Sequence, residues 1–193
     1  MHFVLVHGFN VKNAGATTVD QLAYYIRDAG HTVDVDEGDY GYFNIWMIRL
    51  FRRGHRARVL YRLAKAFETA DVIITHSNGA NFTTKAMDML DSEYNNTKIV
   101  IHISPALNRK TFIPQAVKAQ LVLHTPKDWA VRLSSYIPWF PWGRMGAFGY
   151  KGEDNRNTNL EDSLVKSHSA WFTKLRKAIT WSYCNRFVKE HGA

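Results

Sequence analysis

Short apolar runs recur along this chain, and segments with helical patterns separate them. Five runs have the continuous or alternating apolar character of strands, at residues 3–6, 32–35, 72–75, 98–103 and 120–124. Strands that alternate with helices in this way form a parallel sheet whose two faces are both covered. The sequence therefore predicts an α/β fold, a three-layer α/β/α sandwich with a mostly parallel sheet.

The segments between the runs carry the start and stop signals of helices. Thr17 or Thr18 stands where a helix would be capped, and Gly30 stands where that helix would end. A further helix is expected from Asn78 to about residue 90, and a last one over residues 169–181. Residues 150–159 are polar and rich in turn-forming types, and they show no apolar pattern.

Length and composition indicate one domain. A chain of 193 residues with 46% hydrophobic and 22% charged residues is ordinary for a globular protein with a substantial core. We expect a single domain over residues 1–193, with short cap-like insertions near 38–56 and 132–150. Cys184 is the only cysteine, so no intrachain disulfide can form.

The opening residues have the pattern of a strand rather than of a leader. Residues 1–6 lack the basic segment that begins a signal peptide. No apolar run approaches the ~20 residues that are needed to span a bilayer. We therefore expect a cytoplasmic protein, or one exported without a conventional leader.

Residues that can carry chemistry follow the predicted strands directly. The segments 7–9, 76–78 and 104–105 come after three of the strands, and Asp128 lies just beyond a fourth. In an open parallel sheet, ligands gather at the carboxyl ends of the strands. We therefore expect these segments to meet at one edge of the sheet.

Ser77 is the candidate nucleophile. It lies in Thr75-His76-Ser77-Asn78-Gly79, between a β-branched strand and a predicted helix, and such a strand-turn-helix lifts a serine hydroxyl clear of a sheet. The first N–H groups of the helix would stabilise an anion that forms beside the hydroxyl. The alternative is that Ser77 only caps the helix.

A serine hydroxyl needs a base to take its proton and a carboxylate to orient that base. Asp128 and His168 follow Ser77 in the chain in that order, which is the order of one large hydrolase class. Asp154 or Asp162 is the alternative for the acid, and Asp128 would then only cap a turn. The alternative for His168 is a structural residue at the start of the last helix, packed against an aromatic neighbour.

These motifs resemble those of the small α/β-hydrolases of the esterase and lipase type. The matching segments are His7-Gly8-Phe9, Thr75-His76-Ser77-Asn78-Gly79, Asp128 and Ser167-His168-Ser169, and they span nearly the whole chain. The chain departs from the family pattern at Thr75, where a glycine is usual, and it lacks the first strands of larger members. The resemblance implies a compact α/β-hydrolase fold.

The resemblance also implies roles for these residues. Ser77 would attack a carbonyl carbon, His168 would act as the base, and Asp128 would orient His168. Backbone N–H groups of Phe9 and Asn78 would form the oxyanion hole, and an acyl-enzyme would be hydrolysed by water.

No metal or organic cofactor is expected. His7, His76, His102 and His124 lie in or beside strands, where a structural histidine is the more frequent case. No pair of histidines has the helical spacing of a metal site.

The net charge of +8 is clustered. Seven basic residues and no acidic one lie between positions 49 and 65: Arg49, Arg52, Arg53, Arg56, Arg58, Arg62 and Lys65. The same segment has apolar residues at helical spacing, namely Leu60, Leu63, Ala64 and Phe67. This pattern predicts an amphipathic helix with an apolar inner face and a basic outer face. That face is either solvated surface or a contact for an anionic surface. No nucleic acid partner is expected, because the aromatic motifs of RNA-binding modules are missing.

The expected substrate is a small ester, with an acyl or lipid-like group. Residues 104–107 have small side chains that would leave space beside Ser77. Aromatic and aliphatic residues in 46–51 and 136–142 would overhang the site, where they suit an acyl chain or a lipid interface. Alternatively, they complete the core.

Two functional hypotheses follow from the sequence. The first is a serine esterase or lipase, or a thioesterase or amidase with the same mechanism. The second is a hydrolase-like module without catalytic activity that binds an anionic polymer or a membrane surface. The complete set of Ser77, Asp128 and His168 favours the first.

Overall fold

The computed structural model describes residues 1–8, 17–35, 53–136 and 142–192. Its sheet has six strands, and every neighbouring pair is parallel. From one edge to the other the strands are β2 (Thr32–Val35), β1 (His2–Val6), β3 (Val72–His76), β4 (Lys98–Ile103), β5 (Val117–His124) and β6 (Asn157–Glu161). The strand order reverses between β1 and β3, and a crevice for ligands forms at such a point in a parallel sheet.

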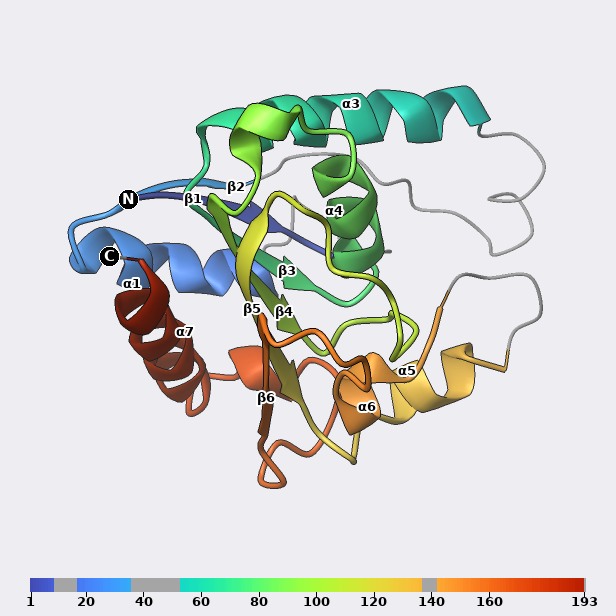
Figure 1. Ribbon diagram of the computed structural model, residues 1–193. Coiled ribbons are helices and arrows are strands. Elements are labelled where there is room, and N and C mark those ends of the chain that lie inside the picture. The colour runs from blue at the N-terminus through green and yellow to red at the C-terminus, as the bar shows by residue number, and fades with distance from the viewer. Residues whose placement is uncertain (9–16, 36–52, 137–141, 193) are drawn as a thin grey trace.

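Helices cover both faces of the sheet, as the sequence predicted. One face carries α1 (Ala23–Asp28), α7 (Lys177–His191) and the short 3-10 turns Val19–Leu22 and Ala170–Phe172. The other carries α3 (Arg53–Thr69) and α4 (Gly79–Met87), while α5 (Trp129–Ser134) and α6 (Met145–Phe148) follow β5 (Figure 1). The three-layer α/β/α class is therefore confirmed.

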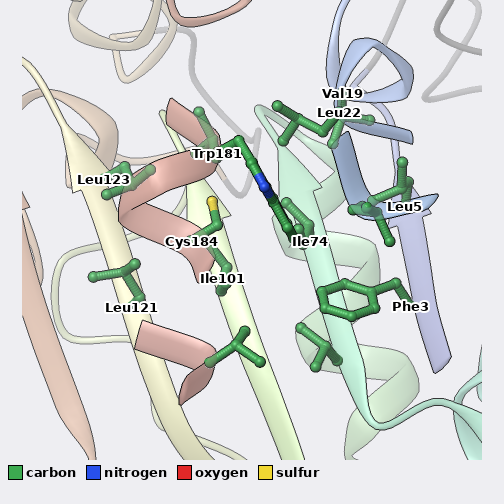
Figure 2. Packing of buried hydrophobic residues seen from close by; sticks show 14 of the residues in the cluster. Phe3, Leu5, Val19, Leu22, Ile74, Ile101, Leu121, Leu123, Trp181 and Cys184 are labelled. Atoms are coloured by element: carbon green, nitrogen blue, oxygen red, sulfur yellow. The ribbon is translucent and has the colours of Figure 1, made fainter. Parts of the chain in front are cut away.

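Two apolar cores lie on opposite faces of the sheet. In β3, Val72 and Ile74 point into one core, and Ile73 between them points into the other. A strand that is buried on both faces needs apolar residues at every position, and this explains the continuous runs in the sequence. In the first core, Trp181 and Cys184 of α7 lie over the strands (Figure 2). Burial raises the pKa of the Cys184 thiol to about 12, so this cysteine is structural.

The sixth strand was not predicted. Its residues Asn-Thr-Asn-Leu-Glu are polar and mostly exposed, because β6 is an edge strand with little core to cover. Side-chain hydrogen bonds replace apolar packing there. The Nε2 group of Gln120 donates to Oδ1 of Asn157 at 2.9 Å, and Asn159 bonds to both the N–H and the carbonyl of Tyr150.

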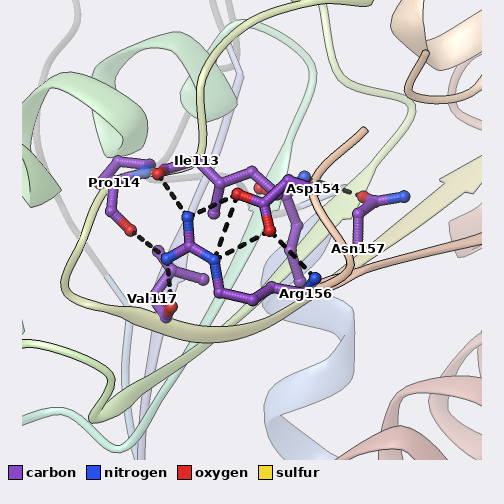
Figure 3. Close-up of polar contacts among 7 residues, drawn as sticks. Ile113, Pro114, Val117, Asp154, Arg156 and Asn157 are labelled. Atoms are coloured by element: carbon purple, nitrogen blue, oxygen red, sulfur yellow. Dashed lines mark hydrogen bonds and ion pairs between the residues drawn. The ribbon is translucent and has the colours of Figure 1, made fainter. Parts of the chain in front are cut away.

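Arg156 fastens the chain that enters β6 to the start of β5. Its guanidinium pairs with Asp154 at 2.6 Å and donates to the carbonyls of Ile113, Pro114 and Val117 (Figure 3). Since Val117 begins β5, this cluster lies at the amino-terminal ends of the strands.

Several predicted boundaries were wrong. The last helix was expected over 169–181, but a 3-10 turn occupies Ala170–Phe172 and α7 starts only at Lys177. The helix after Ser77 ends at Met87 rather than near 90, and β5 starts at Val117 rather than at 120. Of the two predicted insertions, residues 38–52 and 137–141 lie outside the described part of the chain.

The predicted amphipathic helix corresponds to α3. Leu63, Ala64 and Phe67 are buried in the second core, and Arg58 and Arg62 are exposed. Arg49 and Arg52 lie outside the described residues, as do the side chains of Arg53 and Arg56. None of the helices that the structure describes combines the length and the apolar character needed to cross a membrane.

Candidate active site

Ser77 lies in the sharp turn between β3 and α4. Its backbone has φ of +55°, a left-handed conformation that non-glycine residues seldom adopt. Hydrogen bonds hold the turn, because the N–H of Ser77 donates to the carbonyl of Ile103 and its own carbonyl accepts from Ala80 and Ala106. Such a strained turn between strand and helix is typical of a nucleophile elbow. The capping alternative is not supported, since the N-cap residue of α4 is Asn78 and no side chain caps this helix.

Two glycines allow the turn to approach the end of β1. A Cβ atom on Gly79 would lie 2.5 Å from the carbonyl oxygen of His7, and one on Gly8 would lie 2.8 Å from Cβ of Ser77. Both distances are shorter than real side chains tolerate. Thr75 stands where the first glycine is usual, and its buried hydroxyl has a partner, because it lies 2.7 Å from Nδ1 of His102.

Asp128 and His168 are in direct contact. Oδ2 of Asp128 lies 2.8 Å from Nδ1 of His168, and the carboxylate is fully buried. The other oxygen, Oδ1, accepts the N–H of Val131 at 3.0 Å and thereby caps α5. The sequence offered an orienting acid or a turn cap for Asp128 as alternatives, and the structure contains both contacts.

Ser77 and His168 line the same cavity. It has a volume of about 230 Å³, and the residues around it are Ser77, Asn78, Ala106, Ala130, Val131, Ser134, Trp142 and His168. The indole N–H of Trp142 donates to Oδ1 of Asn78 at 2.8 Å and holds that side chain at the rim. The cavity lies at the carboxyl ends of β3, β4 and β5, because its residues follow those strands.

The remaining predictions about this edge had mixed outcomes. Ala106 lines the cavity as expected, whereas Ser104 is fully buried and accepts the indole N–H of Trp171. Trp142 also reaches the cavity. Phe9, residues 46–51 and residues 137–141 lie outside the described part of the chain, so the predictions on them are not tested.

Asn78 stands at the start of α4, as the oxyanion prediction requires. Among the described residues, no backbone carbonyl accepts its N–H. The N–H groups that begin a helix have no partner within it, and the helix dipole is positive at that end. The N–H of Asn78 is therefore a donor that no backbone carbonyl of the described residues uses, one residue after Ser77.

The alternative acids are engaged elsewhere. Asp154 pairs with Arg156 at the opposite ends of the strands. Asp162 accepts from Nη1 of Arg176 at 2.9 Å and from the N–H of Leu164. Among the described residues, neither of these two carboxylates forms a hydrogen bond or ion pair with His168.

The sequence did not predict that His76 lies beside His168. Its ring lies against that of His168, with centroids 4.6 Å apart, and its Nε2 lies 3.4 Å from the carbonyl oxygen of His168. The ring of Phe172 also packs against that of His76, nearly at a right angle to it. Burial, aided by His168 and His7, holds the pKa of His76 well below its usual value, so this ring is neutral. No local signal reveals this contact, because it joins residues far apart in the chain.

The other histidines make structural contacts. Nδ1 of His7 lies 2.7 Å from the carbonyl oxygen of Gly8, and His102 is bound to Thr75. Within the described ranges, no group of three or more His, Cys, Asp or Glu side chains could hold a metal ion.

Solved structures share this fold. A protein assigned to the α/β hydrolase superfamily, from Xanthomonas campestris pv. campestris, matches with a TM-score of 0.53 and 17% identity over 95% of this chain and 98% of that chain. The esterase domain of a Rhodothermus marinus protein matches with a TM-score of 0.57 and 12% identity, covering 100% of this chain and 88% of that chain. An extracellular α/β-hydrolase from a Paenibacillus species matches with a TM-score of 0.55 and 13% identity, covering 96% of this chain and 98% of that chain.

No protein-family model matches the sequence, and no curated protein does so either. The structural likeness shows the fold: this chain has the α/β-hydrolase fold. The resemblance inferred from the motifs is thus confirmed at the level of architecture.

Proposed function

We propose that this protein is a serine hydrolase that cleaves a carboxylic ester through an acyl-enzyme. Ser77 is the nucleophile, His168 the general base and Asp128 the acid that orients it. The observation that carries the proposal is the 2.8 Å contact between Asp128 and His168, together with the cavity that His168 shares with Ser77. The strained backbone of Ser77 supports the same assignment.

The contact with Asp128 determines which nitrogen of His168 does the chemistry. An Nδ1–H that donates to the carboxylate leaves Nε2 free to accept a proton. Nε2 takes the proton of Ser77 as Oγ attacks the carbonyl carbon, and Asp128 stabilises the imidazolium. The proton then passes to the leaving alkoxide, which departs as an alcohol. Water repeats the sequence on the acyl-enzyme, releases the carboxylic acid and restores Ser77.

The oxyanion is stabilised by backbone N–H groups, namely that of Asn78 and, in this proposal, that of Phe9. A donor of this kind contributes ~3 kcal/mol to transition-state stabilisation. The start of α4 adds the positive end of its dipole.

The cavity favours a small acyl group. Its volume of about 230 Å³ is below the range of most drug-sized ligand sites, and Ala106, Ala130 and Val131 give it small apolar walls. Structural neighbours include an esterase domain, which supports an ester as the substrate. A thioester or an amide would be cleaved by the same steps.

Labelling with a fluorophosphonate probe tests the nucleophile. The native protein should react, the Ser77→Ala variant should not, and His168→Ala should react far more slowly because Oγ loses its base. Ser134→Ala is the matched control, since Ser134 lines the same cavity and should leave labelling intact. Undiminished modification of the Ser77→Ala protein would refute the assignment, and failure of the native protein to react would favour a module that only binds.

A further inference from the structure

The surface beside the cavity exposes large apolar side chains. Trp129, Leu133 and Tyr136 are 59%, 63% and 70% exposed, and Phe148 of the neighbouring α6 is 38% exposed. Together with Arg132 and Arg144 they form what we call the α5–α6 face. Figure 1 shows α5 and α6 close together where β5 ends. An exposed group of large apolar residues in one place marks a contact surface more often than scattered ones do.

Trp129 and Leu133 are four residues apart in α5, and this spacing places them on the same side of the helix. Tyr136 follows in the turn after the helix, where its N–H donates to the carbonyl of Leu133. Val131 on the other side of α5 is buried and lines the cavity. The helix thus has one side toward the cavity and one side toward solvent, and both are apolar.

Guanidinium groups lie among the exposed rings. Arg132 lies 4.2 Å from the centroid of the Trp129 ring and 5.5 Å from that of Phe148, and Arg144 lies 4.5 Å from that of Tyr136. Over the ranges that the structure describes, no ion pair joins Arg132 or Arg144 to a carboxylate. The chain as a whole carries a net charge of +8. The face is therefore both apolar and positively charged.

We propose that the α5–α6 face docks on an anionic lipid surface. Tryptophan and tyrosine favour the boundary between headgroups and acyl chains, and arginines beside them bind anionic headgroups. A second copy of this chain fits less well, since a two-fold contact would bring together the guanidinium groups of the two copies, which no carboxylate of the described residues neutralises. A soluble polyanion would bind the arginines but would leave Leu133 exposed to water.

Docking in this way would bring the cavity beside the lipid. Ala130, Val131 and Ser134 line the cavity from the helix whose outer side carries Trp129 and Leu133. The proposal does not depend on the chemistry of Ser77, because the apolar residues and arginines of this face would bind lipid whether or not the site turns over.

Flotation of the full chain with vesicles tests the proposal. Vesicles of phosphatidylcholine alone are compared with an equal mixture of phosphatidylcholine and phosphatidylglycerol. The native protein should float with the mixture and not with phosphatidylcholine alone. Partition should fall at least about tenfold in Trp129→Ser/Leu133→Ser, through lost apolar contact. In Arg132→Gln it should fall about fivefold, through the lost charge.

Matched controls separate this face from the rest of the surface. Tyr24→Ser removes an equally exposed aromatic residue from α1, and Arg58→Gln removes an exposed charge from α3. Both should partition like the native protein. A thermal melt of the double variant should match that of the native protein, which shows that it is folded without relying on the chemistry of Ser77.

Four results would overturn the docking proposal. One is native protein that floats with neither kind of vesicle, and another is a double variant that floats as well as the native protein. The third is loss of flotation in Arg58→Gln but not in Arg132→Gln, which would move the contact to α3. Self-association that the double variant abolishes, without lipid binding, would identify a second copy as the occupant and would also overturn it.

Discussion

Asp128 uses its two carboxylate oxygens for two different tasks. Oδ1 caps α5 through the N–H of Val131, and Oδ2 holds Nδ1 of His168. On its other side, the ring of His168 rests on that of His76, which is buried and neutral. The orientation of this one imidazole therefore depends on a helix cap and on a ring contact. In the proposed mechanism, both remove freedom that the imidazole would otherwise have to lose during catalysis.

We expect Asp128→Asn to lower kcat for an ester substrate about 10⁴-fold. The amide oxygen still caps α5, but the amide N–H₂ faces Nδ1 of His168 and so favours the tautomer whose Nε2 carries the proton. That nitrogen then cannot accept the proton of Ser77. Steady-state kinetics beside a thermal melt checks this, and the melting temperature should change little. Asp162→Asn, which removes the partner of Arg176, is the control for activity. A kcat within tenfold of the native value would contradict the assigned role.

The unit of β3, turn and α4 depends on how closely α4 approaches the end of β1. Gly79 makes this approach possible, since the carbonyl oxygens of His7 and Val6 lie 2.5 and 2.8 Å from where a Cβ would be. Both are backbone atoms, from the last residue of β1 and the residue after it, so neither can move aside cheaply. The position of Ser77 is thus tied to the packing of a helix against a strand.

Gly79→Ala should destabilise the protein by about 2 kcal/mol and lower kcat about 100-fold. The added methyl group displaces α4, and Ser77 moves with it. Gly30→Ala is the matched control, because its methyl group meets open space. Its φ of +82° costs about 1 kcal/mol in alanine, but the site should be unaffected. Urea denaturation and kinetics measure the two effects, and equal kcat values for both variants would disprove the coupling.

Across the whole molecule, buried histidines connect stability to pH. Burial lowers the pKa of His102 to about 4, and it also lowers the pKa values of His76 and His124. His76 and His124 are the last residues of β3 and β5, and His102 is the next-to-last residue of β4. In the unfolded chain these groups regain their ordinary pKa near 6.5, so that state binds more protons at mildly acidic pH.

The free energy of unfolding should therefore be highest, as far as these histidines determine it, above about pH 7. It should fall as the pH drops toward 4. His102 alone accounts for about 3 kcal/mol of this loss, because one pKa unit corresponds to about 1.4 kcal/mol. His102→Asn should flatten the pH dependence, since asparagine does not titrate and can still bond to Thr75. Ile101→Val, which weakens the same strand but keeps the histidine, should retain the native slope. Urea melts at several pH values measure this, and an unchanged slope in His102→Asn would refute it.

The sequence predicted the parts of the fold whose signal is local. Strands that are buried on both faces appear in the sequence as apolar runs. The predicted bounds of β1, β3 and β4 were therefore within one residue of the observed ones. β6 was missed because an exposed edge strand needs no apolar pattern and is held by side chains such as that of Asn159. The start of α7 was misplaced because residues 169–176 have helix-forming types but form a turn over the core.

The sequence by itself determined the class of the fold and the order of Ser77, Asp128 and His168, since burial pattern, turn chemistry and spacing are written locally. Only the tertiary structure decided that Asp128, and not Asp154 or Asp162, contacts His168. It also decided that His76 lies against His168 and that Trp129 faces solvent. The physical reason is that these contacts join segments far apart in the chain. Their formation depends on how helices and strands pack, which no local pattern encodes.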